Sequence, residues 1–173
     1  MPDFSIAAAI LLDLEGGYAS SDNANGAVNR GITADLLRRL GRPFDPVAVQ
    51  SLTEEETLDI YYEVFWKPIR GDTLPGQEFA NLMLATSVHT GVPRAVKILQ
   101  RLLGVDQDGV LGPKTLAAAI EFGRTLPAVF ASAVWQFYEH LATVNPKMYL
   151  DDLPGWRGRL RRLVPDWEPA RVV

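Results

Sequence analysis

Apolar residues at helical spacing alternate with breaks rich in glycine and proline along the chain. In the first apolar run, residues 4–14, the pattern repeats every three or four positions, which predicts an amphipathic helix. Thr33 and Thr53 precede later runs as helix N-caps, and the glutamates after Thr53 complete a capping box. The whole pattern predicts helices over the approximate ranges 4–16, 34–40, 54–66, 78–90, 93–104, 113–122, 125–144 and 154–163.

The breaks between these runs suggest how the chain is organised. Residues 18–32 are polar and predict a loop or a short β-hairpin. Residues 68–77 contain two glycines and two prolines and form the best boundary between lobes. We therefore expect a mostly α-helical globule in which residues 1–77 and 78–173 form two lobes packed as one compact unit.

Glu15 ends the first predicted helix at a position suited to acid chemistry. It lies three and four residues after Leu12 and Leu11, so it continues the buried side, and Gly16 and Gly17 then end the helix. Burial and the negative end of the helix dipole both favour the neutral carboxylic acid. A protonated acid near neutral pH is what protonation of a glycosidic oxygen requires. The alternative is an ordinary glutamate at a helix end.

The composition narrows the possible chemistry. Hydrophobic residues make up 47% of the 173 residues, enough for a core, and the net charge of −4 does not suggest a nucleic-acid binder. Cysteine is absent, which excludes disulfides and a thiol nucleophile. The two histidines, His89 and His140, lack the spacing of a catalytic zinc site. We expect no metal and no organic cofactor.

The apolar run near the N-terminus is interpreted as a core helix. It lacks a preceding basic region and a clear cleavage site, so it does not resemble a signal peptide. No stretch reaches the about 18 apolar residues of a membrane span, so we expect no stable membrane insertion. The expected location is the cytoplasm of the host cell, with later access to the periplasm and cell wall through a holin or a secretion system.

Several segments together resemble one family. Glu15–Tyr18 followed by Asn29–Thr33 is similar to the start of glycoside hydrolase family 108, lysozyme-like muramidases of phage endolysins and bacterial cell-wall enzymes. Tyr61–Asp72 resembles the family's Tyr/Trp-rich stretch that ends in Arg-Gly-Asp, and Ala95–Thr115 resembles its peptidoglycan-binding half. Gly155–Trp156 resembles its end. The resemblance implies a lysozyme-like fold with a hairpin near the active site, and a peptidoglycan-binding region at about residues 85–122.

The resemblance also implies roles for residues around Glu15. Asp22 lies in the loop where lysozyme-like folds place a second acidic group, which would stabilise an oxocarbenium ion or orient a water; an Asx-turn residue is the alternative. Thr33 would hold a water or a substrate group and would also cap a helix. Asn29 and Arg30 would line the groove or brace the loop, and Arg30 could pair with Glu15.

Aromatic side chains near these residues are candidates for stacking on sugar rings. Tyr18, beside Glu15, is the first candidate, and Tyr62 and Trp66 are further expected substrate contacts. Tyr61, Phe65 and Trp66 also stand at helical spacing, which more often indicates core packing.

Other polar segments have simpler interpretations. Asp106–Gly109 lacks the remaining ligands of a calcium loop and predicts a turn. The last predicted helix is basic and could attract an anionic cell wall, but we interpret it as a solvated face. Its cations are Arg157, Arg159, Arg161 and Arg162. His89 stands where the family pattern is expected to have asparagine.

We therefore expect a peptidoglycan hydrolase, a lysozyme or N-acetylmuramidase that cleaves β-1,4 bonds between N-acetylmuramic acid and N-acetylglucosamine, with Glu15 as the acid. It would act as a monomer on bacterial peptidoglycan, in cell-wall lysis by a phage endolysin or a secreted bacterial effector. Three alternatives stay open: a lytic transglycosylase, a non-catalytic peptidoglycan-binding or secretion-accessory protein, and a nucleic-acid-binding helical domain.

Overall fold

The first helix leads directly to the candidate acid. The computed structural model describes residues 1–19 and 26–170. Asp3 is the N-cap of α1 (Phe4–Glu15), and its Oδ1 accepts a hydrogen bond from the backbone N–H of Ser5 at 2.7 Å. It ends at Gly16, whose φ of 67° favours glycine. The helix thus delivers Glu15 at its C-terminal end, as the apolar pattern predicts.

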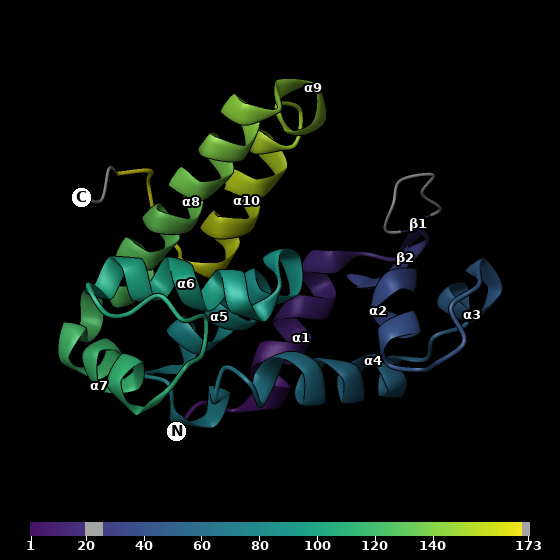
Figure 1. Ribbon diagram of the computed structural model, residues 1–173, viewed down its shortest axis with the longest axis horizontal. Helices are drawn as coiled ribbons and strands as arrows, with labels where there is room; N and C mark the ends of the chain where they lie inside the picture. The colour runs from purple at the N-terminus through teal and green to yellow at the C-terminus, as the bar shows by residue number, and fades with distance from the viewer. Residues whose placement is uncertain (20–25, 171–173) are drawn as a thin grey trace.

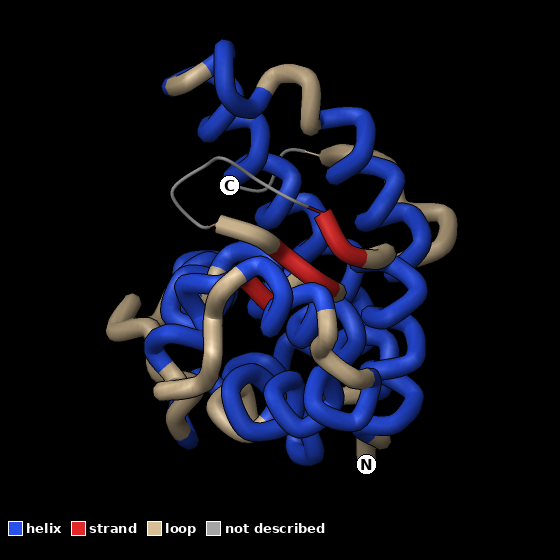
Figure 2. The backbone as a smooth tube through the Cα atoms, turned by 90° about the vertical axis from the view of Figure 1, so that its right-hand side faces the viewer, coloured by secondary structure: helices blue, strands red, loops and turns tan. Residues whose placement is uncertain are grey.

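A small antiparallel sheet follows α1. Its strands are β1 (Tyr18–Ala19), β2 (Val28–Asn29) and β3 (Ile32–Thr33), paired in that order, with Asn29 opposite both Tyr18 and Ile32. Figure 2 shows these short strands beside the helices. The expected hairpin is therefore part of a three-stranded sheet, in which a tight turn at Arg30 and Gly31 joins β2 to β3.

Short helices complete the N-terminal part. They are α2 (Ala34–Arg39), α3 (Pro46–Gln50), α4 (Glu54–Ile60) and η1 (Tyr61–Trp66). The predicted caps are confirmed: Thr33 Oγ1 accepts from the N–H of Leu36, and Thr53 forms a capping box with Glu56. α3 was not predicted, because five residues are too few to show periodicity. η1 is a π-helix rather than a continuation of α4, and its wider turn brings Tyr61, Phe65 and Trp66 into the core.

The Arg-Gly-Asp sequence after η1 has a packing role. A Cβ added to Gly71 would lie 2.2 Å from the Trp66 ring, so only glycine fits there. The indole Nε1–H of Trp66 donates to Asp72 Oδ1 at 2.9 Å. Gly71 begins the 3₁₀ turn η2 (Gly71–Thr73), which leads to α5 (Gln77–Thr90). These contacts fix the connection between the two halves of the chain.

α5 is the central helix. Its residues from Phe79 to Ser87 are all buried, and it packs against α1, α6, α8 and α10. The remaining helices are α6 (Val92–Leu103), α7 (Pro113–Phe122), η3 (Gly123–Thr125), α8 (Leu126–Val144), α9 (Pro146–Tyr149) and α10 (Leu153–Leu163). Figure 1 shows α8 and α10 running side by side above the layer of α5 and α6, with the sheet beyond the end of α1. The predicted mostly α, lysozyme-like globule with a short β element is confirmed.

The segment 106–109 forms the predicted turn. The Gln100 side chain is buried and organises it: its Nε2 donates to Asp108 Oδ1 at 2.6 Å, and its Oε1 accepts from the N–H of Gly109 at 2.9 Å. This hydrogen bond from Gln100 is the main cause that lowers the pKa of Asp108. The turn joins α6 to α7 without any need for a cation.

One stretch is more apolar than the sequence analysis expected. Pro113–Val144, which spans α7, η3 and α8, is long and apolar enough to cross a membrane by length and composition, with 39% of its most apolar window buried. The core helix of a soluble protein passes the same test. α8 supplies Phe130, Val134 and Tyr138 to the core, and these packed side chains account for its apolar character.

Candidate active site

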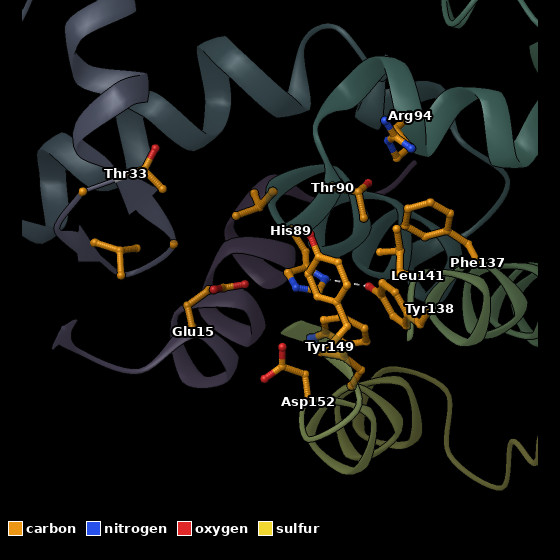
Figure 3. Close-up of a pocket in the computed structure, with 15 residues that line it drawn as sticks. Glu15, Thr33, His89, Thr90, Arg94, Phe137, Tyr138, Leu141, Tyr149 and Asp152 are labelled. Atoms are coloured by element: carbon orange, nitrogen blue, oxygen red, sulfur yellow. Dashed lines mark hydrogen bonds between the residues drawn. The ribbon is translucent and has the colours of Figure 1, made fainter. Parts of the chain in front are cut away.

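A cavity of about 780 Å³ opens beside the end of α1. The sheet and the turns around it form one side of the cavity, and α8 to α10 form the other side. Residues at the C-terminal end of α5 line the cavity between them. Figure 3 shows Glu15 and Thr33 on one side and Phe137 and Leu141 across from them. The lining residues include Glu15, Thr33, His89, Tyr138, Asp152 and Trp156. The volume suits a ligand larger than a single small metabolite.

Glu15 enters this cavity while held by an ion pair. Its side chain is 9% exposed, and Oε1 accepts from the guanidinium of Arg159 in α10, which is 17% exposed. This ion pair fixes the direction of the carboxyl group. Arg30 does not take this place, because its Nη1 donates to the carbonyl of Leu52 at 3.1 Å.

The other cations of α10 are also paired. Arg162 donates to Asp13 of α1, and Arg157 and Arg161 both donate to Glu168. The basic helix is therefore more than a solvated face, since Arg159 and Arg162 fasten α10 to α1. Sequence reasoning missed this, because the partners of these two arginines lie more than 140 positions earlier in the chain.

The β2–β3 turn approaches the carboxyl group of Glu15 closely. A Cβ added to Gly31 would lie 2.9 Å from Glu15 Oε2, and the φ of Gly31 is 72°. The turn is held in place by Tyr61, whose hydroxyl donates to the carbonyl of Arg30 at 2.5 Å. Asn29 is buried and its Nδ2 donates to the carbonyl of Val49 at 3.0 Å. Asn29 and Arg30 thus brace the loop, one of the two roles considered for them, and neither lines the cavity described here.

Two of the three predicted catalytic residues, Glu15 and Thr33, lie in the described part of the chain. Thr33 lines the cavity with Glu15 and also caps α2. Asp22 lies outside the described residues. Asp152, just before α10, is the second carboxylate that lines the described part of the cavity. In the view of Figure 3, Thr33 lies above Glu15 and Asp152 below it.

The aromatic residues predicted to contact sugar are not among those that line this cavity. Tyr18 is exposed on β1, and Tyr62 packs edge-on against Phe4 with ring centroids 5.1 Å apart. Trp66 is fully buried in the core.

A different aromatic set lines the cavity: Phe137, Tyr138, Tyr149 and Trp156. Tyr138 and Trp156 stack at 4.6 Å, and Trp156 and Tyr149 lie 5.9 Å apart. Of these, only Trp156 lay in a segment that the family resemblance had singled out.

His89 packs against this aromatic set, and we call the five residues together the aromatic wall. Its Nδ1 lies 2.7 Å from the hydroxyl of Tyr138, and its ring lies 5.4 Å from that of Trp156. Burial, and then the charge of Arg159, lower the pKa of His89 to about 4. Burial raises the pKa of Tyr138. His89 and Tyr138 are therefore uncharged near neutral pH, and the partly exposed rings of Phe137, Tyr149 and Trp156 can contact a sugar ring.

Comparisons with known proteins gave matches to two family models and to solved structures. The sequence model described as Glycosyl hydrolase 108 matches residues 8–91, and the one described as Predicted Peptidoglycan domain matches residues 94–161. The solved structure of SagA from Brucella abortus is similar, with 32% sequence identity and a TM-score of 0.76 over 94% of this chain and 96% of SagA. No curated protein matches the chain.

Proposed function

Because the chain belongs to the glycosyl hydrolase 108 family and carries a predicted peptidoglycan domain after it, we propose that it is a muramidase. The two matches support a role in hydrolysing or binding peptidoglycan. The proposed reaction is hydrolysis of the β-1,4 bond between N-acetylmuramic acid and N-acetylglucosamine. The observation that carries the proposal is Glu15, a nearly buried carboxyl group aimed into a cavity with an aromatic wall.

In this mechanism Glu15 is the general acid. It donates a proton to the glycosidic oxygen as the bond to the anomeric carbon breaks. Because Arg159 occupies Oε1 of Glu15, the substrate would displace this guanidinium when its glycosidic oxygen reaches the carboxyl group. Thr33 would hold the attacking water or a substrate hydroxyl beside Glu15. The sugar rings would lie against Tyr149 and Trp156, with the buried Tyr138 packed behind them.

A second carboxylate would stabilise the oxocarbenium-like transition state or direct the water. Asp22 stays the candidate from the sequence, and the structure adds Asp152 as a second candidate. Replacing each by asparagine would distinguish them, since only the functional carboxylate should be required for turnover.

The remaining expectations are part of the same proposal. The protein would act as a monomer and reach the wall from the cytoplasm through a holin or a secretion system. The division into a catalytic lobe 1–77 and a second lobe 78–173 stays a prediction; the two family matches meet between residues 91 and 94, at the start of α6.

The test is the chemistry of the new chain ends. Purified peptidoglycan is digested with the protein, reduced with borohydride and examined by mass spectrometry. Reduced muramic acid at the new ends supports the proposal. Reduced glucosamine at the new ends would indicate a glucosaminidase, and 1,6-anhydro ends would indicate a lytic transglycosylase. Binding to the wall without release of fragments would indicate a binding protein.

A further inference from the structure

The cavity at Glu15 continues along α6. A hollow of about 560 Å³ shares Thr90, Arg94 and Phe137 with it, and a smaller hollow of about 330 Å³ adjoins through Arg101 and Phe137. We call these two hollows the α6 branch; its polar lining includes Arg94, Lys97, Arg101, Gln107 and His140. Figure 3 shows Arg94 and Phe137 at the end of the main cavity away from Glu15. A ligand that fills the main cavity can therefore extend into the branch.

The α6 branch is positively charged, although the whole chain carries a net charge of −4. Arg94, Lys97 and Arg101 follow one another at positions i, i+3 and i+7, so they lie along one face of α6. All three are exposed, and within residues 1–19 and 26–170 none forms a salt bridge. The arginines of α10, by contrast, all do.

No acidic side chain in the part of the chain that the structure describes forms a salt bridge with this row. Among the described residues, no aspartate or glutamate lines either hollow. Asp108 interacts electrostatically with Lys97, but its carboxylate accepts hydrogen bonds from Gln100 and Val110 and forms no salt bridge with Lys97. The three cations therefore remain available to an anionic ligand.

One cation is also held in position. The guanidinium of Arg94 lies 5.3 Å from the centre of the Phe137 ring, a cation–π contact. Both residues line the main cavity and the branch, so this contact fixes a positive charge where the two spaces join. Lys97 and Arg101 then continue the positive row away from Glu15.

We propose that the α6 branch binds the carboxylates of the peptide stem of peptidoglycan. The proposal rests on the proposed function, which places the glycan in the main cavity. The stem is an anionic peptide attached to the muramic acid, with free carboxylates on its D-glutamate and at its end. From Arg94 to Arg101 the helix rises about 10 Å, which is the length of about three extended peptide residues. The row therefore matches the length over which the stem presents its carboxylates.

The test compares two double variants of equal charge. Lys97→Gln/Arg101→Gln removes two cations of the α6 branch, and Lys114→Gln/Arg124→Gln removes two exposed cations that line none of the cavities described here. Each protein is sedimented with phosphate-free peptidoglycan, intact or stripped of its stems by an amidase. Binding is read from the amount of protein in the pellet after a short incubation on ice, before hydrolysis reduces the amount of wall.

The α6 variant should bind intact peptidoglycan about three- to tenfold more weakly than wild type, with a smaller effect of added salt. On stripped glycan it should equal wild type, and the Lys114→Gln/Arg124→Gln variant should equal wild type on both. Equal binding of all three proteins to intact peptidoglycan would overturn the proposal, as would an equal loss on both materials. The proposal would also be overturned if the wild-type protein sedimented with a phosphate-bearing wall polymer but not with phosphate-free peptidoglycan. Release of fragments, measured in the same tubes, tests the hydrolase separately.

Discussion

At the scale of residues, the carboxyl group of Glu15 is set by three neighbours from different parts of the chain. Gly16 ends α1, Arg159 holds Oε1, and Gly31 leaves room for Oε2. Glu15 and Thr33 both line the cavity, and their places at a helix end and a helix cap could be predicted because these are local features. It could not predict Arg159, since that contact depends on how the last helix folds back.

Gly31→Ala tests the close approach to Glu15. The new Cβ would meet Oε2 at 2.9 Å and displace the carboxyl group, so fragment release should fall about tenfold to a hundredfold. The matched control is Gly41→Ala, which has a similar positive φ of 67° but no atom within 4 Å. Both variants should lose about 1 kcal/mol of stability from backbone strain, and only Gly31→Ala should lose activity. Equal activity in the two variants would contradict this role of Gly31.

His89 makes stability depend on pH. Its pKa is about 4 in the folded protein and about 6.5 in the unfolded chain, so the unfolded state binds more protons between these values. The stability from the buried neutral ring is complete above about pH 6.5 and is lost as the pH falls towards 4. Urea denaturation of wild type should show about 2–3 kcal/mol more loss between pH 7 and pH 4.5 than His89→Asn, which cannot titrate. Equal losses would show that His89 is not responsible.

At the scale of elements, α10 is the piece that completes the cavity. It pairs with α1 through Arg159 and Arg162, packs on α8, and carries Trp156 into the aromatic wall. The sequence predicted the helix but not its role, because its charge pattern also fits a solvated face. The π-helix η1 was also missed, since Tyr61 to Trp66 satisfy an α-helical pattern equally well.

Arg159→Met tests the docking of α10. It leaves Glu15 without a partner at 9% exposure, so the free energy of unfolding should fall by about 2–4 kcal/mol. A double-mutant cycle with Glu15→Gln should give a coupling energy of about 1–3 kcal/mol in urea denaturation.

Arg161→Met is the control on the same helix. Its pair with Glu168 is exposed, at 46% and 64%, and its loss should cost less than about 1 kcal/mol. If the two arginine variants lose the same stability, the buried pair has no special part in holding α10.

At the scale of the whole molecule, the cavity lies where distant parts of the chain meet. Glu15, Thr33 and the sheet come from the first 33 residues, and Tyr138 and Trp156 from the last 36. The family resemblance indicated the fold and the substrate class, and local patterns indicated most helices. The aromatic wall could not be predicted, because Tyr138 and Tyr149 look like core or surface residues until α8 and α10 are placed against α1.

The most direct test of the account is the loss of Glu15 alone. Glu15→Gln keeps the shape of the side chain but cannot donate a proton, so release of fragments from purified peptidoglycan should fall about 10²–10⁴-fold. Circular dichroism should show a folded protein, and Glu63→Gln, which alters an exposed glutamate of η1, should keep the wild-type rate. A folded Glu15→Gln protein that releases fragments at the wild-type rate would contradict the account.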